Sequence, residues 1–308
     1  RDTFEALFAT AEVTPALVDG RLAVTEAEPL ARAFRLVERL MVAANEAVAS
    51  FLVANEVPAL YRAHQGLDPE RLERLRAAVE MADAQVPELG EQTPDAQVVS
   101  AQLLSEIDRL GELGRDDDRA LLVAVATGST ARATYEPDPT QHLGLASGAY
   151  THFTSPIRRY ADLIVHRQLR AALAGEAVPY TPDDLRRLSD WLDARAGAMS
   201  HLQARERGDL WALLLDRGYL DGAEPATITG VSVNGLRVRL PRLGVTGFIT
   251  AERALWLEPK QRGRLEVDEH GLATTSGPWR VGSEVEVRFV GLDDTGRTVW
   301  RLGEGPAT

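Results

Sequence analysis

The spacing of apolar residues changes once along this chain, near Ala223, and that change most constrains the fold. Before it, apolar residues recur every three or four positions, as on one face of a helix. After it they alternate with polar residues, as in "GLRVRL" at positions 235–240, which is typical of a half-buried strand. The sequence therefore predicts an α+β protein with a mainly helical region over residues 1–222 and a small all-β barrel over residues 223–308.

The two regions also differ in charge. Residues 1–222 hold 23 basic and 35 acidic side chains, whereas residues 223–308 hold 11 of each, so the first region carries the entire net charge of −12. The chain has no cysteine, which excludes disulfides and thiolate metal sites. We find no signal peptide and no apolar run long enough to span a bilayer. We therefore expect a monomeric cytoplasmic protein with no membrane partner.

Local signals predict several elements of the first region. Asp19-Gly20 lies between two short apolar runs and predicts a β-hairpin over residues 15–26. Pro29 predicts the first turn of a helix that continues to residue 55. Thr181, followed by Pro182 and two aspartates, predicts the start of a helix that reaches residue 215.

Two adjacent arginines follow a predicted helix start in "TSPIRRYADLIVHRQL". Pro156 suits the first turn of a helix and Ser155 its cap, which would place Arg158 and Arg159 in that first turn. The helix dipole disfavours cations there, but free backbone N–H groups and two guanidinium forks attract phosphate. One hypothesis is a phosphate site. The other is that both arginines pair with nearby carboxylates.

A glutamate interrupts the apolar face of the long helix. Glu206 lies one helical step from both Leu202 and Leu210, so we expect it to point inward. Burial of an ionised carboxylate is costly unless it meets a cation, a metal or strong donors. Glu206 would then either face a substrate channel or form a structural ion pair. The candidate partners for that pair are Arg158, Arg205 and Arg207.

Other charged residues are less informative. Glu38 borders the apolar face of the early helix beside Phe34 and Met41, and so repeats the pattern of Glu206 less sharply. The three consecutive aspartates at 116–118 cannot all face one ion on a helix, so we expect them to cap the helix that begins at Arg119. The six histidines show no metal-binding spacing, and phosphate-binding glycine loops are absent.

The segment "HLGLASGAYTHFTSPIRRYADLIVHRQL" closely resembles the ribonuclease II and ribonuclease R family of exoribonucleases. The segments "LVERLMVAANEAVA" and "LQARERGDLWALLL" resemble two further helices of that family. The final region, "ATITGVSVNGLRVRLPRLGVTGFIT", resembles its S1-type RNA-binding domain. The resemblance implies the C-terminal portion of an RNB-type catalytic domain over residues 1–222 and an S1-type OB-fold over residues 223–308. Residues 67–139 match most loosely.

The resemblance also implies roles for particular residues. Arg158 matches the arginine that holds phosphates at the 3′ end of RNA, and Glu206 matches a catalytically important glutamate. Glu38 matches a glutamate that contacts the terminal ribose and helps to select RNA over DNA. The further residues expected to contact substrate are Ser155, Arg159 and Tyr160 near the motif, and Arg237 and Arg239 in the barrel.

The family's reaction is processive 3′-to-5′ hydrolysis of single-stranded RNA to nucleoside 5′-monophosphates, assisted by Mg²⁺. Its magnesium ligands are aspartates in the first half of the catalytic domain, which nothing in this chain matches. We therefore expect no metal ligand in this chain, a missing N-terminal half of the same protein that supplies the ligands, and no activity from this chain alone.

Two other functions compete with this one. The first is a non-catalytic RNA-binding or regulatory protein of the same fold, in which Arg237, Arg239 and aromatic residues such as Phe248 bind single strands. The second treats Glu38 and Glu206 as the acid and base of a glycosidase. The glycosidase hypothesis explains neither the paired arginines nor the barrel.

Overall fold

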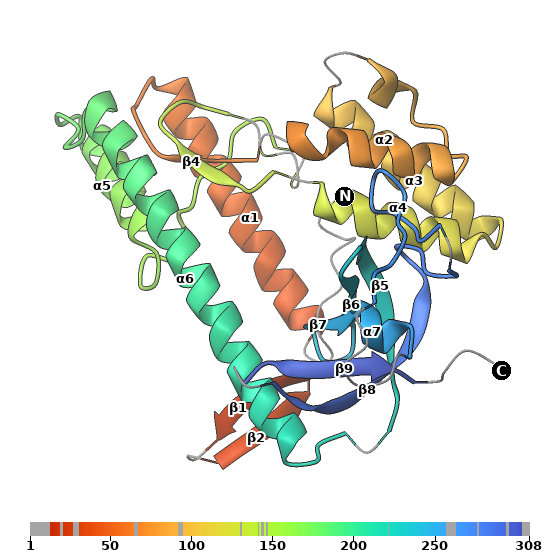
Figure 1. Ribbon diagram of the computed structural model, residues 1–308. Coiled ribbons are helices and arrows are strands. Elements are labelled where there is room, and N and C mark those ends of the chain that lie inside the picture. Colours follow the sequence, from red (N-terminus) through yellow and green to blue (C-terminus); the bar gives the residue numbers. More distant parts are fainter. Residues whose placement is uncertain are drawn as a thin grey trace. The chain divides into compact units, whose positions relative to one another are not determined.

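A computed structural model gives the fold of the chain (Figure 1). It describes residues 13–18, 21–26, 31–64, 67–91, 95–129, 131–140, 142, 145, 147–220, 222–256, 263–275, 277–293 and 296–303. The described residues form two compact units. Unit 1 combines those of Glu28–Leu67 with those of Thr130–Leu202, and unit 2 combines those of Leu7–Ala27, Asp68–Ser129 and Gln203–Thr308.

The α+β class predicted from the sequence is confirmed. The compact units do not follow the division at residue 222, because the helices between Asp68 and Ser129 cluster with the C-terminal sheet. That division describes family domains and stays a prediction. Among the described residues, no helix combines the length and the apolar character that a membrane span needs.

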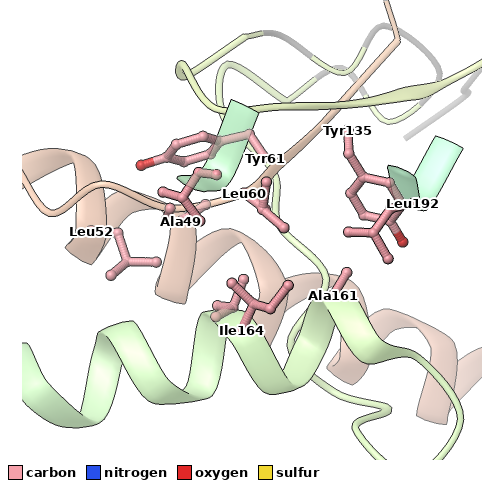
Figure 2. Close-up of a cluster of buried hydrophobic side chains, with 11 residues drawn as sticks. Ala49, Leu52, Leu60, Tyr61, Tyr135, Ala161, Ile164 and Leu192 are labelled. Carbon is pink, nitrogen blue, oxygen red and sulfur yellow. The ribbon is translucent and has the colours of Figure 1, made fainter. Parts of the chain in front are cut away.

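Unit 1 packs three helices around two short strands. Its elements are α1 (Ala31–Ala54), β3 (Tyr61–Ala63), β4 (Thr134–Glu136), α5 (Tyr160–Ala174) and the first part of α6 (Pro182–Asp216), and β3 pairs antiparallel with β4. Figure 2 shows Ala161 and Ile164 of α5 facing Leu52 and Leu60 in the core of this unit. The core also takes in Ala49, Ala59, Tyr61, Tyr135, Val165, Leu185 and Leu192.

The start of α6 lies where the sequence predicts it. Thr181 and Asp184 exchange hydrogen bonds: the Thr181 hydroxyl accepts the N–H of Asp184 at 3.3 Å, and the Asp184 carboxylate accepts the N–H of Thr181 at 3.1 Å. This reciprocal cap satisfies two backbone donors that a helix start leaves without intrahelical partners.

Unit 2 contains a helical part. Its elements are the 3₁₀ turns η2 (Pro69–Arg71) and η3 (Pro87–Gly90) and the helices α2 (Leu72–Met81), α3 (Ala96–Glu112) and α4 (Asp116–Gly128). The predicted helix at Arg119 in fact begins at Asp116, so the three aspartates occupy its first turn instead of capping it. Asp118 pairs with Arg115 and Arg280, each at 2.7 Å, which removes it from capping.

Unit 2 also contains a five-stranded antiparallel sheet in the order β7-β6-β5-β8-β9. Its elements are β5 (Glu224–Ser232), β6 (Gly235–Leu240), β7 (Val245–Thr250), the short helix α7 (Ala251–Ala254), β8 (Glu284–Leu292) and β9 (Thr298–Leu302). The outer strands β7 and β9 lie against each other, because Gly247 leaves room for the ring of Trp300. This closure agrees with the predicted OB-type barrel.

The alternation predicted for β6 is confirmed, with Leu236, Val238 and Leu240 fully buried and Arg237 exposed. The predicted N-terminal hairpin is present as β1 (Val13–Val18) and β2 (Arg21–Glu26), which pair antiparallel. Its turn at Asp19-Gly20, and Pro29 before α1, lie outside the described residues.

Candidate functional site

The loop before α5 is held by one buried side chain of α1. Asn45 is 2% exposed, and its amide nitrogen donates to the Tyr150 hydroxyl at 2.7 Å. Its amide oxygen accepts the N–H groups of Phe153 at 3.0 Å and Thr154 at 3.2 Å. Asn45 thus uses both ends of its amide to fix the loop. Sequence reasoning did not identify Asn45, since its partners lie more than one hundred positions away.

The same loop is fixed at its other end by a buried aspartate. Asp162 has no exposed surface, and it accepts the N–H of Ser155 at 2.7 Å. The Arg159 guanidinium donates to both oxygens of this carboxylate, at 2.8 and 3.0 Å. Such a two-pronged pair, with an additional backbone donor, compensates the buried charge. Arg159 therefore pairs with a carboxylate, as the second of the two hypotheses predicts.

This pairing explains why the predicted helix start is wrong. The helix α5 begins at Tyr160, with Arg159 in extended conformation at its cap position, and not at Pro156. Ser155 does not cap the helix, because its N–H binds Asp162 and its carbonyl accepts the N–H groups of Arg158 and Arg159 in a turn.

Arg158 is exposed on that turn. Its guanidinium lies 3.5 Å from the Ser155 hydroxyl, and within the described part of the chain it forms no ion pair. The next residue toward the N-terminus, Ile157, is 98% exposed, so it does not belong to the buried face of α5. The motif therefore presents one exposed guanidinium, that of Arg158, beside the guanidinium of Arg159, which is held by Asp162.

An aromatic groove lies beside the start of α5. Tyr160 and Trp191 are 42% and 47% exposed, and their rings meet edge to face with centroids 6.1 Å apart. Together with Tyr180, Asp184, Arg187 and Leu188 they line a groove of about 570 Å³. Tyr160, predicted to contact substrate, therefore has an accessible ring surface.

Two histidines near the loop have lowered pKa values: His142 is buried and His152 is half-buried. The His152 Nδ1 lies 2.8 Å from the Tyr135 hydroxyl, and the Arg62 guanidinium stacks over the Tyr135 ring at 4.6 Å. Burial, reinforced by the charges of Arg159 and Arg62, lowers the pKa of His152 to about 3. Burial also lowers the pKa of His142 to about 4. Neither group is suited to exchange a proton near neutral pH.

The expectation that Glu206 points inward is wrong. Glu206 is exposed on α6, and its neighbours Met199 and Leu202 are 55% and 61% exposed. The helix buries apolar residues as far as Leu192 and again from Trp211, and residues 201–209 between them are all exposed. None of the three proposed arginines forms an ion pair with Glu206 within the described residues.

Glu38 is likewise exposed, on the N-terminal half of α1, where the neighbouring Phe34 is 67% exposed. Glu38 belongs to unit 1, as does the loop that carries Ser155, Arg158, Arg159 and Tyr160. Glu206, Arg237 and Arg239 belong to unit 2. Four of the predicted residues thus lie together at the junction of this loop and α5.

In the barrel, Arg237 of β6 is exposed and lies directly across from Phe248 of β7, which is 42% exposed. Arg239 is half-buried and lies across from Thr246. An exposed aromatic ring beside a guanidinium on the face of an OB-type sheet is the arrangement that binds single-stranded nucleic acid.

The described residues do not fit a magnesium site. Among them, no group of three or more histidine, aspartate or glutamate side chains lies close enough to hold a metal ion.

Comparison with known proteins identifies the family of this chain. The RNB domain model matches residues 5–175. Ribonuclease R of Aquifex aeolicus is 31% identical over 85% of the chain, and exoribonuclease 2 of an Enterobacter species is 33% identical over 73% of it. The chain spans 36% and 33% of the lengths of these two proteins, about a third of each.

Among solved structures, the fold is similar to that of Mycoplasma genitalium RNase R in complex with ribose-methylated single-stranded RNA. The TM-score is 0.73 at 20% identity, over 97% of this chain and 47% of that one. With the domain match over more than half of the sequence, this likeness leads to one conclusion: the chain belongs to the RNB-domain family of ribonuclease II and ribonuclease R.

Proposed function

We propose that the protein to which this chain belongs is a 3′-to-5′ exoribonuclease that degrades single-stranded RNA to nucleoside 5′-monophosphates. The family membership supports RNA hydrolysis, and RNase R in complex with RNA has the same fold. Processive action, a cytoplasmic location and a monomeric state belong to the same proposal.

The observation that carries the proposal is the contrast between Arg158 and Arg159. Asp162 commits Arg159 to the loop, while Arg158 keeps an exposed guanidinium at a fixed place. A guanidinium presents paired N–H donors that match two oxygens of a phosphate. Negative charge builds on those oxygens when water attacks the phosphorus and the bond to the ribose O3′ breaks. Arg158 would stabilise that charge, in the manner of an oxyanion-binding donor.

Glu206, Glu38 and Tyr160 take supporting parts in this proposal. Their exposure leaves them accessible to a substrate. Tyr160 offers a ring surface for stacking, and the two glutamates offer acceptors for hydroxyl groups. Magnesium ions would be held by ligands outside the described residues, which contain no cluster that could hold a metal ion. The addition of EDTA should then stop hydrolysis.

The test is RNA hydrolysis by the full-length protein and its Arg158→Gln variant. Loss of one donor to a developing oxyanion typically lowers kcat by two to three orders of magnitude, so we expect about 100-fold slower hydrolysis or more. Arg170→Gln is the matched control, because Arg170 is an exposed arginine of α5, the helix that follows the motif loop. Equal rates for Arg158→Gln and the unsubstituted protein would contradict the assignment.

A non-catalytic RNA-binding protein of the same fold remains the second candidate. The exposed Phe248 and Arg237 of the barrel support RNA binding equally well in both cases. The two candidates differ in the assay just described. RNA binding without release of mononucleotides, under all metal conditions, would favour the second.

A further inference from the structure

A pocket of about 210 Å³ in unit 2 combines residues of the helical part with residues of the barrel. Its sides are Arg74 of α2, Arg237 of β6, Phe248 of β7 and the turn at His270 and Gly271. Its floor is the end of β5, over residues 230–232. Arg74 belongs to neither the predicted substrate contacts nor the barrel.

Two like charges converge on this pocket. Burial lowers the pKa of the Arg74 guanidinium, and the nearby charge of Arg237 lowers it further. The Arg74 Nε is buried and has no hydrogen-bond partner within the described residues. Two neighbouring cations with an unused buried donor are costly without an anion. The pocket is therefore electrostatically complementary to an anion.

The nearest acid does not supply that anion. Asp268 raises the pKa of Arg74 through its charge, but its carboxylate is occupied by backbone donors. It accepts the N–H groups of His270 at 3.1 Å, Leu272 at 2.8 Å and Ala273 at 2.8 Å. Asp268 thus shapes the turn and leaves the donors of Arg74 to other partners.

The turn at His270 and Gly271 positions the Arg74 side chain. The Gly271 carbonyl accepts from the Arg74 Nη2 at 3.2 Å, which fixes the direction of the guanidinium. Gly271 has a φ of +63°, and a Cβ there would lie 3.0 Å from the Val231 carbonyl oxygen. The turn therefore packs closely on β5, and Arg74 is held against the rim of the barrel.

Phe248 provides the apolar side of the pocket. Its ring is 42% exposed, and its backbone lies directly across from that of Arg237 in the pairing of β6 with β7. Exposed rings next to cationic side chains are the usual stacking surface for the bases of single-stranded nucleic acid. Two guanidinium groups and an exposed ring therefore line one pocket, which suits the phosphate and the base of a nucleotide.

We propose that Arg74 and Arg237 together bind one phosphodiester of single-stranded RNA, and that the adjoining base stacks on Phe248. The proposal rests on the proposed function, since it takes RNA as the substrate. It adds a nucleotide-binding position shared between the barrel and the helix α2. A strand held there would be anchored by two parts of the chain instead of by the barrel alone.

The test is the salt dependence of RNA binding to the full-length protein. A 5′-fluorescein-labelled 12-nucleotide oligouridine would be titrated in EDTA and followed by fluorescence anisotropy between 0.05 and 0.3 M salt. Each phosphate contact on a single strand contributes about 0.7 to the slope of log K against log salt. Because Arg237 stays at the same phosphate, Arg74→Gln should lower the slope by up to about 0.7 and weaken binding up to about fivefold at 0.1 M salt.

Three further variants complete the set. Phe248→Ala should weaken binding by a factor of about 5 to 150, which corresponds to one lost base stack, whereas Phe248→Trp should retain affinity. Arg74→Lys keeps the charge and should retain the slope, which guards against a fold defect in Arg74→Gln. Arg119→Gln is the charge control, because Arg119 is exposed in the same unit and does not line the pocket.

The outcomes separate the two proposals. An unchanged slope and affinity for Arg74→Gln, with normal RNA binding by the unsubstituted protein, would overturn the pocket and leave the exoribonuclease proposal standing. An equal drop in slope for Arg119→Gln would also overturn the pocket, since only long-range charge would then matter. An unsubstituted protein that neither binds nor hydrolyses RNA would overturn the proposed function itself.

Discussion

The ion pair between Arg159 and Asp162 should be the main stabilising contact of the motif loop. Arg159→Gln would leave the Asp162 carboxylate, which has no exposed surface, with the Ser155 N–H as its hydrogen-bond donor within the described residues. Removal of one partner from a buried pair costs about 3–5 kcal/mol. Because the Arg159 side chain is 22% exposed, water can partly replace it, and we expect a loss near 3 kcal/mol.

A double-mutant cycle isolates this coupling. Asp162→Asn in the Arg159→Gln background removes the uncompensated charge, so the double variant should regain about 2 kcal/mol relative to the additive sum. Urea denaturation of the four proteins, followed by circular dichroism, gives the free energy of unfolding for each. Single losses that add to the double loss within about 0.5 kcal/mol would refute the coupling between Arg159 and Asp162. They would also refute the inference that this pairing leaves Arg158 without an ion pair in the part of the chain that the structure describes.

Two further predictions concern packing and pH. Gly247→Ala places a Cβ 2.7 Å from the Trp300 ring, so we expect a lower melting temperature and a loss of about 1–3 kcal/mol; an unchanged melting temperature would contradict the closure of the sheet. The pKa of His152 falls from 6.5 to about 3 on folding, so below pH 6.5 the unfolded chain binds a proton that the folded protein does not. As the pH falls below 6.5, His152 alone should lower the free energy of unfolding by up to about 1.4 kcal/mol per pH unit, and His152→Gln should reduce the slope measured by urea denaturation between pH 5 and 7; an identical slope would refute it.

Much of the fold could be predicted from the sequence, because its signals are local. Thr181 and Asp184 cap α6 through contacts three residues apart, and the alternation in β6 follows from the pleat of a strand. The start of α5 could not be predicted in this way. There the Asp162 side chain, seven positions along the chain, accepts the Ser155 N–H, and this contact overrides the helix-start preference of Pro156.

The site was predictable only where residue type alone defines the chemistry. The paired arginines were identified, but their division of labour depends on the buried Asp162. The inward position of Glu206 was inferred from helical spacing, which says nothing of whether another part of the chain covers that face. Asn45 and Arg74 were missed because their partners, Tyr150 and Gly271, lie 105 and 197 positions away.

The most direct test of the proposed function is the identity of the products and the end from which they are released. The full-length protein would be incubated with Mg²⁺ and 5′-labelled single-stranded RNA that carries either a free or a blocked 3′ end. We expect stepwise shortening from the free 3′ end, release of nucleoside 5′-monophosphates, and protection of the blocked substrate. Internal cleavage at equal rates on both substrates, or tight binding with no shortening, would contradict a 3′-to-5′ exoribonuclease.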